Sequence, residues 1–441
     1  MEEWVTMAAP VNPPRGMRDF LPADKARREH ALGVIKSVYR SHGFDEIETP
    51  VVEDYARLHA GLGGDNEKLS FSILKRGIRP EALAAASEAG NAEQLADLGL
   101  RFDLTVPLTR FYASHRAELP PVFRAIQIAP VWRAERPQKG RYRQFVQADI
   151  DVIGEAGLLA EIELVTATSQ ALAALGLDGC VIRVNDRRVL FGLLEHCGFP
   201  ADTHDRALIT VDKLDKIGAE GVVEELREID AAAAERIGAV LASVEPALAG
   251  EGIALTRSAI EAALPGAAQN PGAAAGIENL AQLGEALDGA LPSGVTVRFD
   301  PTLVRGMGYY TGTIFEVAHP GSGSSVGGGG RYDGMVGRFL GQDVPAVGFS
   351  IGFERVVDLI SLPESSGPEA VALVYDADVP FAELVALKRE LVARGHRVRL
   401  EKRQKNMKAL LARIAAEGFT SFANVRAGAG VDALELRPLS D

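Results

Sequence analysis

Four side chains on one face of a strand-like segment could recognise a flat, polar ligand. In "QFVQADIDVIG", Phe145, Gln147, Asp149 and Asp151 alternate with mostly apolar residues, so they share one face of an extended chain. A half-solvated antiparallel strand would show the same alternation. An exposed ring among carboxylates, however, makes better sense as a platform on which a planar ligand stacks. Gln147 and Asp151 lie roughly 13 Å apart along a strand and could hold different ends of one small molecule.

The loop before this segment is strongly basic. Its sequence "RAERPQKGRYR" contains one acidic and five basic residues: Glu135, Arg133, Arg136, Lys139, Arg141 and Arg143. A charge run is usually a solvated loop, but this one lies between two strand-like segments and beside the aromatic and acidic face. A polyphosphate or a nucleic acid end is the better hypothesis, because guanidinium groups match phosphate oxygens in pairs. The absence of a Walker lysine motif and of a dinucleotide-binding glycine motif disfavours the two common nucleotide folds.

A further arginine stands in "LVRGMGYYTGTIFEV", residues 303–317. Arg305 precedes Gly306, and a glycine there would let a fixed cation approach a substrate closely. If the chain is extended at Tyr309 and Tyr310, their rings point to opposite faces, so at most one of them meets the ligand while the other packs. A hairpin with a surface arginine explains these residues equally well.

Two glycine-containing segments follow. In "GGGGRYDG", residues 327–334, the glycine run is more typical of a flexible loop than of a phosphate cradle, although Arg331 and Tyr332 strengthen the case for a ligand. Arg355 follows Gly352 at the start of a predicted helix, where a phosphate or an adenine could lie against its guanidinium and the helix N-terminus. A structural salt bridge is the alternative for Arg355.

The elements that position these residues follow from periodicity and turn signals. Asp24 can cap a helix that Gly43 ends, "FDEIETPVV" is strand-like, and residues 80–98 predict a surface helical insertion. A strand pair, "FRAIQIAPVW" and "QFVQADIDVIG", brackets the basic loop, and "AVGFSIGFERVVDLI" predicts a strand followed by a helix. Residues 196–290 are mostly helical in pattern and carry no obvious chemistry, which suggests an insertion or a lid.

The C-terminal part predicts a small domain. After the linker "LPESSGPE", strand and helix patterns alternate as in an α/β domain. Between Lys388 and Lys408, nine Lys and Arg stand against Glu390 and Glu401. Solvated helix faces explain part of this excess, and a basic side that contacts an RNA backbone is the other interpretation.

Composition limits the classes of protein. The 441 residues, 47% of them hydrophobic, can form two or three domains, and the net charge of −13 argues against unspecific coating of nucleic acid or anionic membranes. Two cysteines, Cys180 and Cys197, without a metal-binding spacing disfavour a zinc site and a disulfide framework. Without an apolar run of about 20 residues or a positively charged start, the chain is expected to be cytoplasmic, with no membrane contact.

Taken together, these segments resemble the class II aminoacyl-tRNA synthetases, and specifically the histidyl-tRNA synthetase family, from about residue 14 to the end. "FDEIETPVVED", with Pro50, is similar to motif 1, "VWRAERPQKGRYRQFVQADIDVIG" to motif 2 and "AVGFSIGFERV" to motif 3. "LVRGMGYYTGTIFEV" and "GGRYDGMV" are similar to two histidine signatures that other class II enzymes lack.

The resemblance implies an α+β fold: a six-stranded antiparallel catalytic sheet flanked by helices, a helical insertion and a small C-terminal α/β domain. The implied division is a catalytic domain in two parts, 1–195 and 291–364, around an insertion at 196–290, with an anticodon-binding-like domain at 365–441. The implied assembly is a homodimer built partly on motif 1. The implied reaction joins L-histidine to histidine tRNA through a histidyl-adenylate and releases AMP and pyrophosphate.

The resemblance also implies roles for single residues. The predicted catalytic residues are Arg133 and Arg305; the ATP-binding residues are Arg133, Glu135, Arg141, Phe145 and Arg355; the histidine-binding residues are Asp103, Thr105, Gln147, Asp151, Tyr309, Tyr310 and Tyr332. ATP would enter with Mg²⁺, no prosthetic group is expected, and no side chain is assigned as a metal ligand. Gly308 departs from the acidic residue of many relatives, and only about 75 residues follow the linker, fewer than is usual for the family.

Two other functions fit parts of the chain. A non-aminoacylating paralogue of this family serves as a regulatory subunit of ATP phosphoribosyltransferase and senses histidine, but it normally lacks the C-terminal domain and has a degraded motif 2 or signature arginine. This chain keeps "ERPQKGRYRQF" and Arg305. A binding module of a larger RNA-sensing protein would need fused domains that 441 residues do not accommodate.

Overall fold

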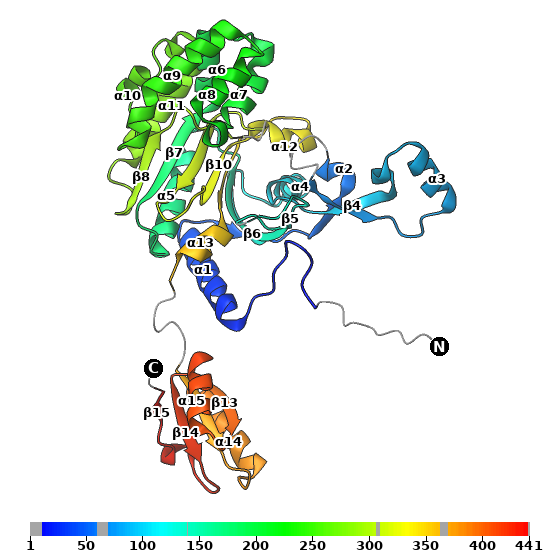
Figure 1. Cartoon of the computed structure of the whole chain (residues 1–441), viewed down its shortest axis with the longest axis vertical. Helices are drawn as coiled ribbons and strands as arrows, with labels where there is room; N and C mark the ends of the chain where they lie inside the picture. Colours follow the sequence, from blue (N-terminus) through cyan, green and yellow to red (C-terminus); the bar gives the residue numbers. More distant parts are fainter. Residues whose placement is uncertain (1–10, 60–68, 139, 306–308, 362–368, 440–441) are drawn as a thin grey trace. The chain divides into compact units, whose positions relative to one another are not determined.

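A computed structural model describes residues 11–59, 69–138, 140–305, 309–361 and 369–439 of the chain (Figure 1). The chain divides into two compact units. The first comprises Met1–Asp19 and Ala31–Ile360, and the second comprises Phe20–His30 and Ser361–Asp441. The four-part division predicted from the sequence is finer than these two units and stays a prediction. Among the described residues, no helix combines the length and the apolar character that crossing a lipid bilayer requires.

The first unit is built on an eight-stranded sheet with the strand order β1-β5-β6-β11-β10-β9-β7-β8. The bounds are β1 Asp45–Glu46, β5 Phe123–Trp132, β6 Gln144–Ile153, β7 Cys180–Asp186, β8 Val295–Phe299, β9 Thr313–Ala318, β10 Gly327–Arg331 and β11 Ala346–Ile351. The strands from β5 to β7 in this order pair antiparallel, which confirms the predicted six-stranded sheet. One further strand pairs in parallel at each edge of these six, β1 beside β5 and β8 beside β7. Neither strand was part of the predicted sheet.

Helices cover the sheet because its strands are apolar on both faces. Helix α5 (Leu159–Ala174) buries Leu164, Val165 and Leu172, and helix α1 (Pro22–Ser41) presents Ile35 and Tyr39 to the same core. As predicted, α1 ends just before Gly43, whose φ of 82° suits a residue without a side chain. The shorter helices of this unit are α2 Tyr55–Leu58, α4 Thr105–His115, α12 Asp333–Leu340 and α13 Phe353–Leu359.

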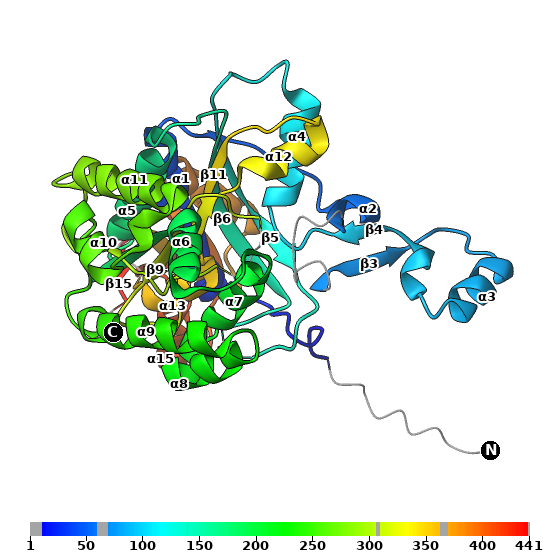
Figure 2. The same ribbon diagram turned by 90° about the horizontal axis from the view of Figure 1, so that it is seen from above.

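A helical segment connects β7 to β8. It consists of α6 Arg187–Cys197, α7 His204–Val211, α8 Leu214–Arg227, α9 Ala231–Ala249, α10 Arg257–Ala263 and α11 Pro271–Leu287. Side-chain caps from Asp186, Asp230, Thr256 and Asn270 start four of these helices. Figures 1 and 2 show the segment gathered beside β7 and β8, on the side of the sheet opposite to helix α3 (Pro80–Glu88). The first of its helices begins at Arg187, nine residues before the predicted insertion.

A small sheet projects from the first unit and corrects two predictions. It contains β2 Val52–Asp54, β4 Ala96–Leu100 and β3 Phe71–Leu74, in that order. The strand-like run before it is broken around Pro50, so β1 and β2 belong to different sheets. The helix predicted over 80–98 stops early: α3 covers Pro80–Glu88, Gly90 has a φ of 59°, and β4 then pairs with both neighbouring strands.

The second unit is a small α/β domain, as predicted. Its sheet has the order β13-β12-β14-β15, with bounds β12 Ala370–Tyr375, β13 Arg397–Lys402, β14 Ser421–Val425 and β15 Arg437–Pro438. Helix α14 (Phe381–Ala393) buries Leu384 and Leu387 with one face of β12, and helix α15 (Met407–Ala416) buries Leu410 and Ile414 with the other. Because each face has its own apolar cluster, this unit has a core that is independent of the larger sheet.

We expect Gly329→Ala to destabilise the first unit, because a Cβ at Gly329 would lie 1.9 Å from the carbonyl oxygen of Gly348 on the neighbouring strand. The two backbones would have to separate, and overpacking of this kind costs about 1–3 kcal/mol. Gly334→Ala is the matched control, since a Cβ there meets nothing within 4 Å. The midpoints of urea unfolding should fall for the first variant only. Equal midpoints for both variants would contradict the close approach.

Candidate active site

The predicted site residues lie around one cavity in the first unit. Its volume is about 530 Å³, and strands β6, β9, β10 and β11 form its floor. All thirteen residues predicted for the site line it: Asp103, Thr105, Arg133, Glu135, Arg141, Phe145, Gln147, Asp151, Arg305, Tyr309, Tyr310, Tyr332 and Arg355. They come from segments as far apart in sequence as Asp103 and Arg355, so the fold brings together residues that the motifs identified separately.

Strand β6 supplies one wall of the cavity. The four residues predicted to share a face, Phe145, Gln147, Asp149 and Asp151, all line the cavity, and Val146 from the other set lines it as well. The guanidinium of Arg133 lies over the ring of Phe145, 5.1 Å from its centroid, and its Nε donates a hydrogen bond of 2.9 Å to the carbonyl of Phe102. Burial lowers the pKa of Arg133 below its ordinary value. The planar ring and the fixed cation therefore stand together at one end of the strand.

The other end of β6 forms a polar, aromatic pocket. The Tyr332 hydroxyl donates a 2.6 Å hydrogen bond to Oδ1 of Asp151, and both residues are buried. The Tyr309 ring meets the Tyr332 ring edge-on at 6.3 Å. The predicted opposite orientation of Tyr309 and Tyr310 is wrong, because the chain turns there instead of running extended, and their ring centroids lie 4.7 Å apart. Gly306 and Gly308, to which the sequence drew attention, fall outside the described residues.

Buried carboxyls give this pocket an unusual acid–base character. Burial raises the pKa of Asp151 to about 7, the hydrogen bond from Tyr332 opposes the shift, and the charge of Asp103 adds to it. Burial and the charge of Asp151 raise the pKa of Asp149 well above its ordinary value. Gln147 donates to Asp149 at 3.1 Å, while its own Oε1 is buried without a hydrogen-bond partner among the described residues. A ligand with N–H donors would satisfy both the buried carboxyl groups and the amide oxygen of Gln147.

A row of alternating charges fixes Arg305. Its Nη1 lies 3.2 Å from Glu316 on β9, Glu316 also pairs with Arg183 on β7, and Arg183 lies 3.2 Å from Asp300 after β8. Burial alone would lower the pKa of Arg305, but Tyr310 and Glu316 raise it on balance. The alternative of a surface arginine is therefore wrong: Arg305 is a held cation that faces the cavity.

The glycine run is a buried strand, which corrects the expectation of a flexible loop. Side chains of the site occupy the space beside it. A Cβ at Gly328 would lie 2.6 Å from Nη1 of Arg305, and one at Gly330 would lie 2.9 Å from the Tyr310 ring. On β11, a Cβ at Gly348 would lie 2.1 Å from Oδ1 of Asp151. Glycine is needed at these positions because a larger residue would displace the groups that line the cavity.

Arg355 and Arg141 complete the end near Phe145. Arg355, in the first turn of α13, donates to the carbonyl of Ser325, and burial together with the charge of Arg141 lowers its pKa. Arg141 pairs with Glu135 at 3.5 Å. The salt-bridge alternative for Arg355 finds no carboxylate partner among the described residues, so its guanidinium remains available for an anion.

Three other arginines of these sequence motifs lie outside the lining of the cavity. Arg136, Arg143 and Arg331 do not line the cavity. The Nε of Arg143 donates to the carbonyl of Glu135, and Arg331 pairs with Glu161 outside the cavity. Lys139 lies outside the described residues.

Sequence reasoning missed Glu316 and Glu354. Glu354 accepts a 3.0 Å hydrogen bond from the backbone N–H of Val146 and pairs with Arg18, whose guanidinium lies over the Tyr142 ring at 3.4 Å. These contacts tie α13 and the N-terminal segment to β6. The only signal was an acidic residue beside a proposed ligand-binding arginine in "FERV", and no pattern in one sequence distinguishes such a brace from a surface charge.

Comparisons with known proteins identify the family of this chain. A family model described as Histidyl-tRNA synthetase matches residues 91–356. The histidine–tRNA ligase of Leifsonia xyli subsp. xyli is 67% identical over 435 residues, which cover 99% of this chain and 100% of that protein. The histidine–tRNA ligase of Rhodopirellula baltica is 40% identical over 375 residues, 83% of this chain and 78% of that protein.

Solved structures show the same fold. A histidyl-tRNA synthetase from a Nostoc species superimposes with a TM-score of 0.73 at 25% identity, and the match covers 95% of this chain and 92% of that one. A protein from Bacillus halodurans, titled as an ATP phosphoribosyltransferase regulatory subunit/histidyl-tRNA synthetase, also gives a TM-score of 0.73, at 23% identity and over 96% and 99% of the two chains. The second likeness supports the fold alone.

The antiparallel sheet, with arginines and a stacking ring around a cavity on one face, has the architecture of a class II aminoacyl-tRNA synthetase. Within that class, the chain belongs to the histidyl-tRNA synthetase family.

The raised pKa of Asp151 predicts how pH changes stability. Between its ordinary value of 3.8 and its folded value of about 7, the folded chain binds more protons at this carboxyl than the unfolded chain does. Stability therefore falls as pH rises through this window, by up to about 1.4 kcal/mol per pH unit. Asp151→Asn removes this loss, so the variant should gain stability relative to wild type as pH rises from 5 to about 7 and no further above it. Unfolding midpoints measured across that range test the sign, and a difference independent of pH would contradict it.

Proposed function

We propose that the cavity holds MgATP and L-histidine end to end and joins them as a histidyl-adenylate, from which histidine passes to its tRNA. The chain is a histidine–tRNA ligase by its family and by its full-length relationship to the Leifsonia protein. One observation carries the proposal for the site: the two arginines, the stacking ring and the acidic pocket line a single cavity. Phe145 and Asp151 are six residues apart on β6, roughly 20 Å along the strand, which suits an extended ligand with a ring at each end.

The imidazole of histidine binds at the Asp151 end. An imidazole N–H donates to the Asp151 carboxylate, which the Tyr332 hydroxyl keeps in place, and the Tyr309 and Tyr310 rings enclose the imidazole. Asp103, Thr105 and Gln147 receive the α-amino group, and the unpartnered Oε1 of Gln147 is one acceptor for it. A ligand without a ring N–H leaves a buried acceptor unsatisfied, which is how such a site rejects other amino acids.

ATP binds at the Phe145 end. Its adenine stacks on Phe145, with Glu135 and Arg141 as neighbouring contacts, and its phosphates lie against Arg133 and Arg355. Arg133 is already fixed by the Phe102 carbonyl, so little side-chain entropy is lost when the phosphate arrives. Mg²⁺ enters with the nucleotide as part of the substrate, and the protein contributes no prosthetic group to the reaction.

The first chemical step is attack by the histidine carboxylate on the α-phosphorus. Negative charge builds on the equatorial oxygens, and Arg133 and Arg305, held before the reaction begins, stabilise it. Pyrophosphate leaves. In the second step a ribose hydroxyl of the tRNA end attacks the carbonyl of the adenylate and AMP leaves. No side chain of the cavity is assigned as the base, so a phosphate oxygen of the adenylate accepts that proton.

The second unit contacts the tRNA. Several of its arginines are neutralised within the unit: Arg399 and Arg413 pair with Glu401 and Glu417. Lys402, Lys405 and Lys408, between the end of β13 and the start of α15, have no ion pair in the described part of the chain. Unpaired lysines on an otherwise acidic protein suit an RNA backbone. We further infer a cytoplasmic homodimer in which motif 1 contributes to the interface.

The regulatory-subunit alternative is not favoured. The chain matches the Leifsonia ligase over 99% of its length, and it retains Arg133 and Arg305 in the cavity. The deciding experiment is charging of purified histidine tRNA with labelled histidine by the isolated protein. Attachment that requires both ATP and the tRNA supports the proposal. Histidine binding without charging would restore the regulatory reading.

Arg305→Ala should abolish adenylate formation while it leaves histidine binding largely intact, because the guanidinium acts on the α-phosphate rather than on the imidazole. Histidine-dependent pyrophosphate exchange should fall by about 10²–10³-fold, the usual effect of removing one preorganised donor. Calorimetric affinity for histidine should change little. Arg298→Ala, on strand β8 and outside the cavity, is the control. Normal exchange in the Arg305 variant would defeat the proposed mechanism.

Replacing Lys402, Lys405 and Lys408 together by Ala should weaken tRNA binding without affecting pyrophosphate exchange, because exchange needs no tRNA. The slope of log affinity against log salt should decrease by about 2–3, as expected for the loss of three phosphate contacts. The matched control is Arg413→Ala, which removes a basic side chain that is already paired. An unchanged slope in the triple variant would place the tRNA elsewhere.

A further inference from the structure

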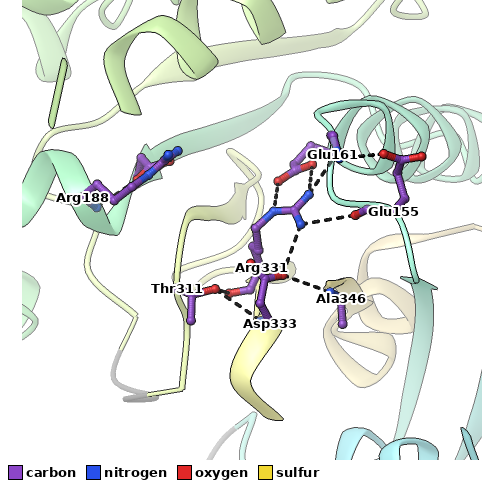
Figure 3. A network of polar contacts seen from close by, with 9 residues as sticks. Glu155, Glu161, Arg188, Thr311, Arg331, Asp333 and Ala346 are labelled. Atoms are coloured by element: carbon purple, nitrogen blue, oxygen red, sulfur yellow. Dashed lines mark hydrogen bonds and ion pairs between the residues drawn. The ribbon is translucent and has the colours of Figure 1, made fainter. Parts of the chain in front are cut away.

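Arg331 lies beside the pocket but points away from it. It is the last residue of β10, it does not line the cavity, and its neighbour Tyr332 does. Figure 3 shows its side chain reaching the first turn of helix α5. Nε and Nη2 each donate a 2.7 Å hydrogen bond to one oxygen of Glu161, a two-point pairing with a carboxylate that is 2% exposed.

The remaining nitrogen of Arg331 adds further hydrogen bonds to this pairing, and we call the contacts of the Arg331 guanidinium together the clamp. Its Nη1 lies 3.2 Å from Oδ1 of Asp333 and 3.3 Å from the Glu155 carbonyl, and Nη2 also donates to the Gly157 carbonyl at 3.1 Å. One guanidinium thus joins the end of β10 to the loop after β6 and to the start of α5. The charged side chains that face it are Glu161, Asp333 and Arg188 (Figure 3). Asp186 neutralises Arg188 through a 2.7 Å ion pair.

The same few residues fix the three tyrosines of the pocket. The Arg331 carbonyl accepts a 2.8 Å hydrogen bond from Thr311, which directly follows Tyr309 and Tyr310. Tyr332 N–H donates to the Ala346 carbonyl at 2.7 Å, and Ala346 N–H donates to Asp333 at 3.0 Å. Tyr332 therefore stands between two clamped residues, and its hydroxyl in turn orients Asp151.

We propose that Arg331, together with Glu161, is a positioning residue for histidine recognition: it fixes the backbone from which Tyr332 reaches Asp151 and against which the Tyr309–Tyr310 turn rests. The inference rests on the proposed function of the pocket and deepens it. Lysine cannot replace this arginine, because an ammonium group lacks the planar fork that meets Glu161 at two points while also reaching Asp333 and two carbonyls. In the part of the chain that the structure describes, none of the hydrogen bonds or ion pairs of the Arg331 side chain reaches the end of the cavity at Phe145.

The contacts of Arg331 predict that its substitution changes the KM for histidine but not the KM for ATP. In histidine-dependent pyrophosphate exchange, Arg331→Lys should raise the KM for histidine at least ten-fold while the KM for ATP stays within two-fold. The matched control is Arg124→Lys. Arg124, on β5, makes the same two-point pairing with Glu163, two residues after Glu161 on the same helix, at 2.7 and 2.9 Å, and it does not line the cavity. The control should leave both KM values within two-fold of wild type.

A second pair of variants guards against misfolding. If Arg331→Lys does not fold, Glu161→Gln tests the same clamp, with Glu163→Gln as its control, and the histidine KM should again rise alone. The inference is overturned if the folded variants keep the wild-type histidine KM, if both KM values rise together, or if the controls show the same effect. Wild-type protein without histidine-dependent exchange would instead refute the proposed function, so the two failures are distinguishable.

Discussion

The site depends on the absence of side chains along one strand. Strand β10 contributes four consecutive glycines to the middle of the sheet, and the volume that their side chains would fill belongs to Arg305, to Tyr310 and to the backbones of β9 and β11. A glycine-rich segment is flexible in isolation, but here ladder hydrogen bonds on both sides hold it extended. The neighbouring strands therefore come close enough for groups from distant parts of the sequence to share one small cavity.

The site also depends on how its charges are arranged, because the cavity brings acidic and basic side chains close together. The cations that face the cavity are held in place: Arg305 by Glu316, and Arg133 by a backbone carbonyl. The acidic end is held by hydroxyl and amide donors instead, and burial keeps the pKa values of Asp151 and Asp149 raised although these hydrogen bonds oppose the shift. One end of the cavity thus offers cations and the other offers buried acceptors, and the proposed direction of ligand binding follows from this difference.

Much of this arrangement could be predicted from the sequence. The alternation in β6 identified one wall of the cavity, and the resemblance of five motifs identified the residues that would gather there. Periodicity could not reveal that the glycines form a strand, because the pattern carries no side chains to alternate. Nor could it reveal the turn that brings Tyr309 beside Tyr310, or that Arg331 faces α5 and not the ligand. These features depend on contacts between distant segments.

The helical segment between β7 and β8 has a consequence for how the protein acquires its site. Strand β7 pairs with β8 and β9 only after the intervening helices have been made, since Asp186 pairs with Thr313 across the whole segment. Pairings so far apart in sequence form slowly, because the closure entropy of the loop comes before any reward from contacts. During synthesis from the N-terminus, β7 is therefore complete before β8 and β9 have been made. The ion pairs that hold Arg305 involve Arg183 on β7, Asp300 after β8 and Glu316 on β9, so they form only after these distant segments have come together.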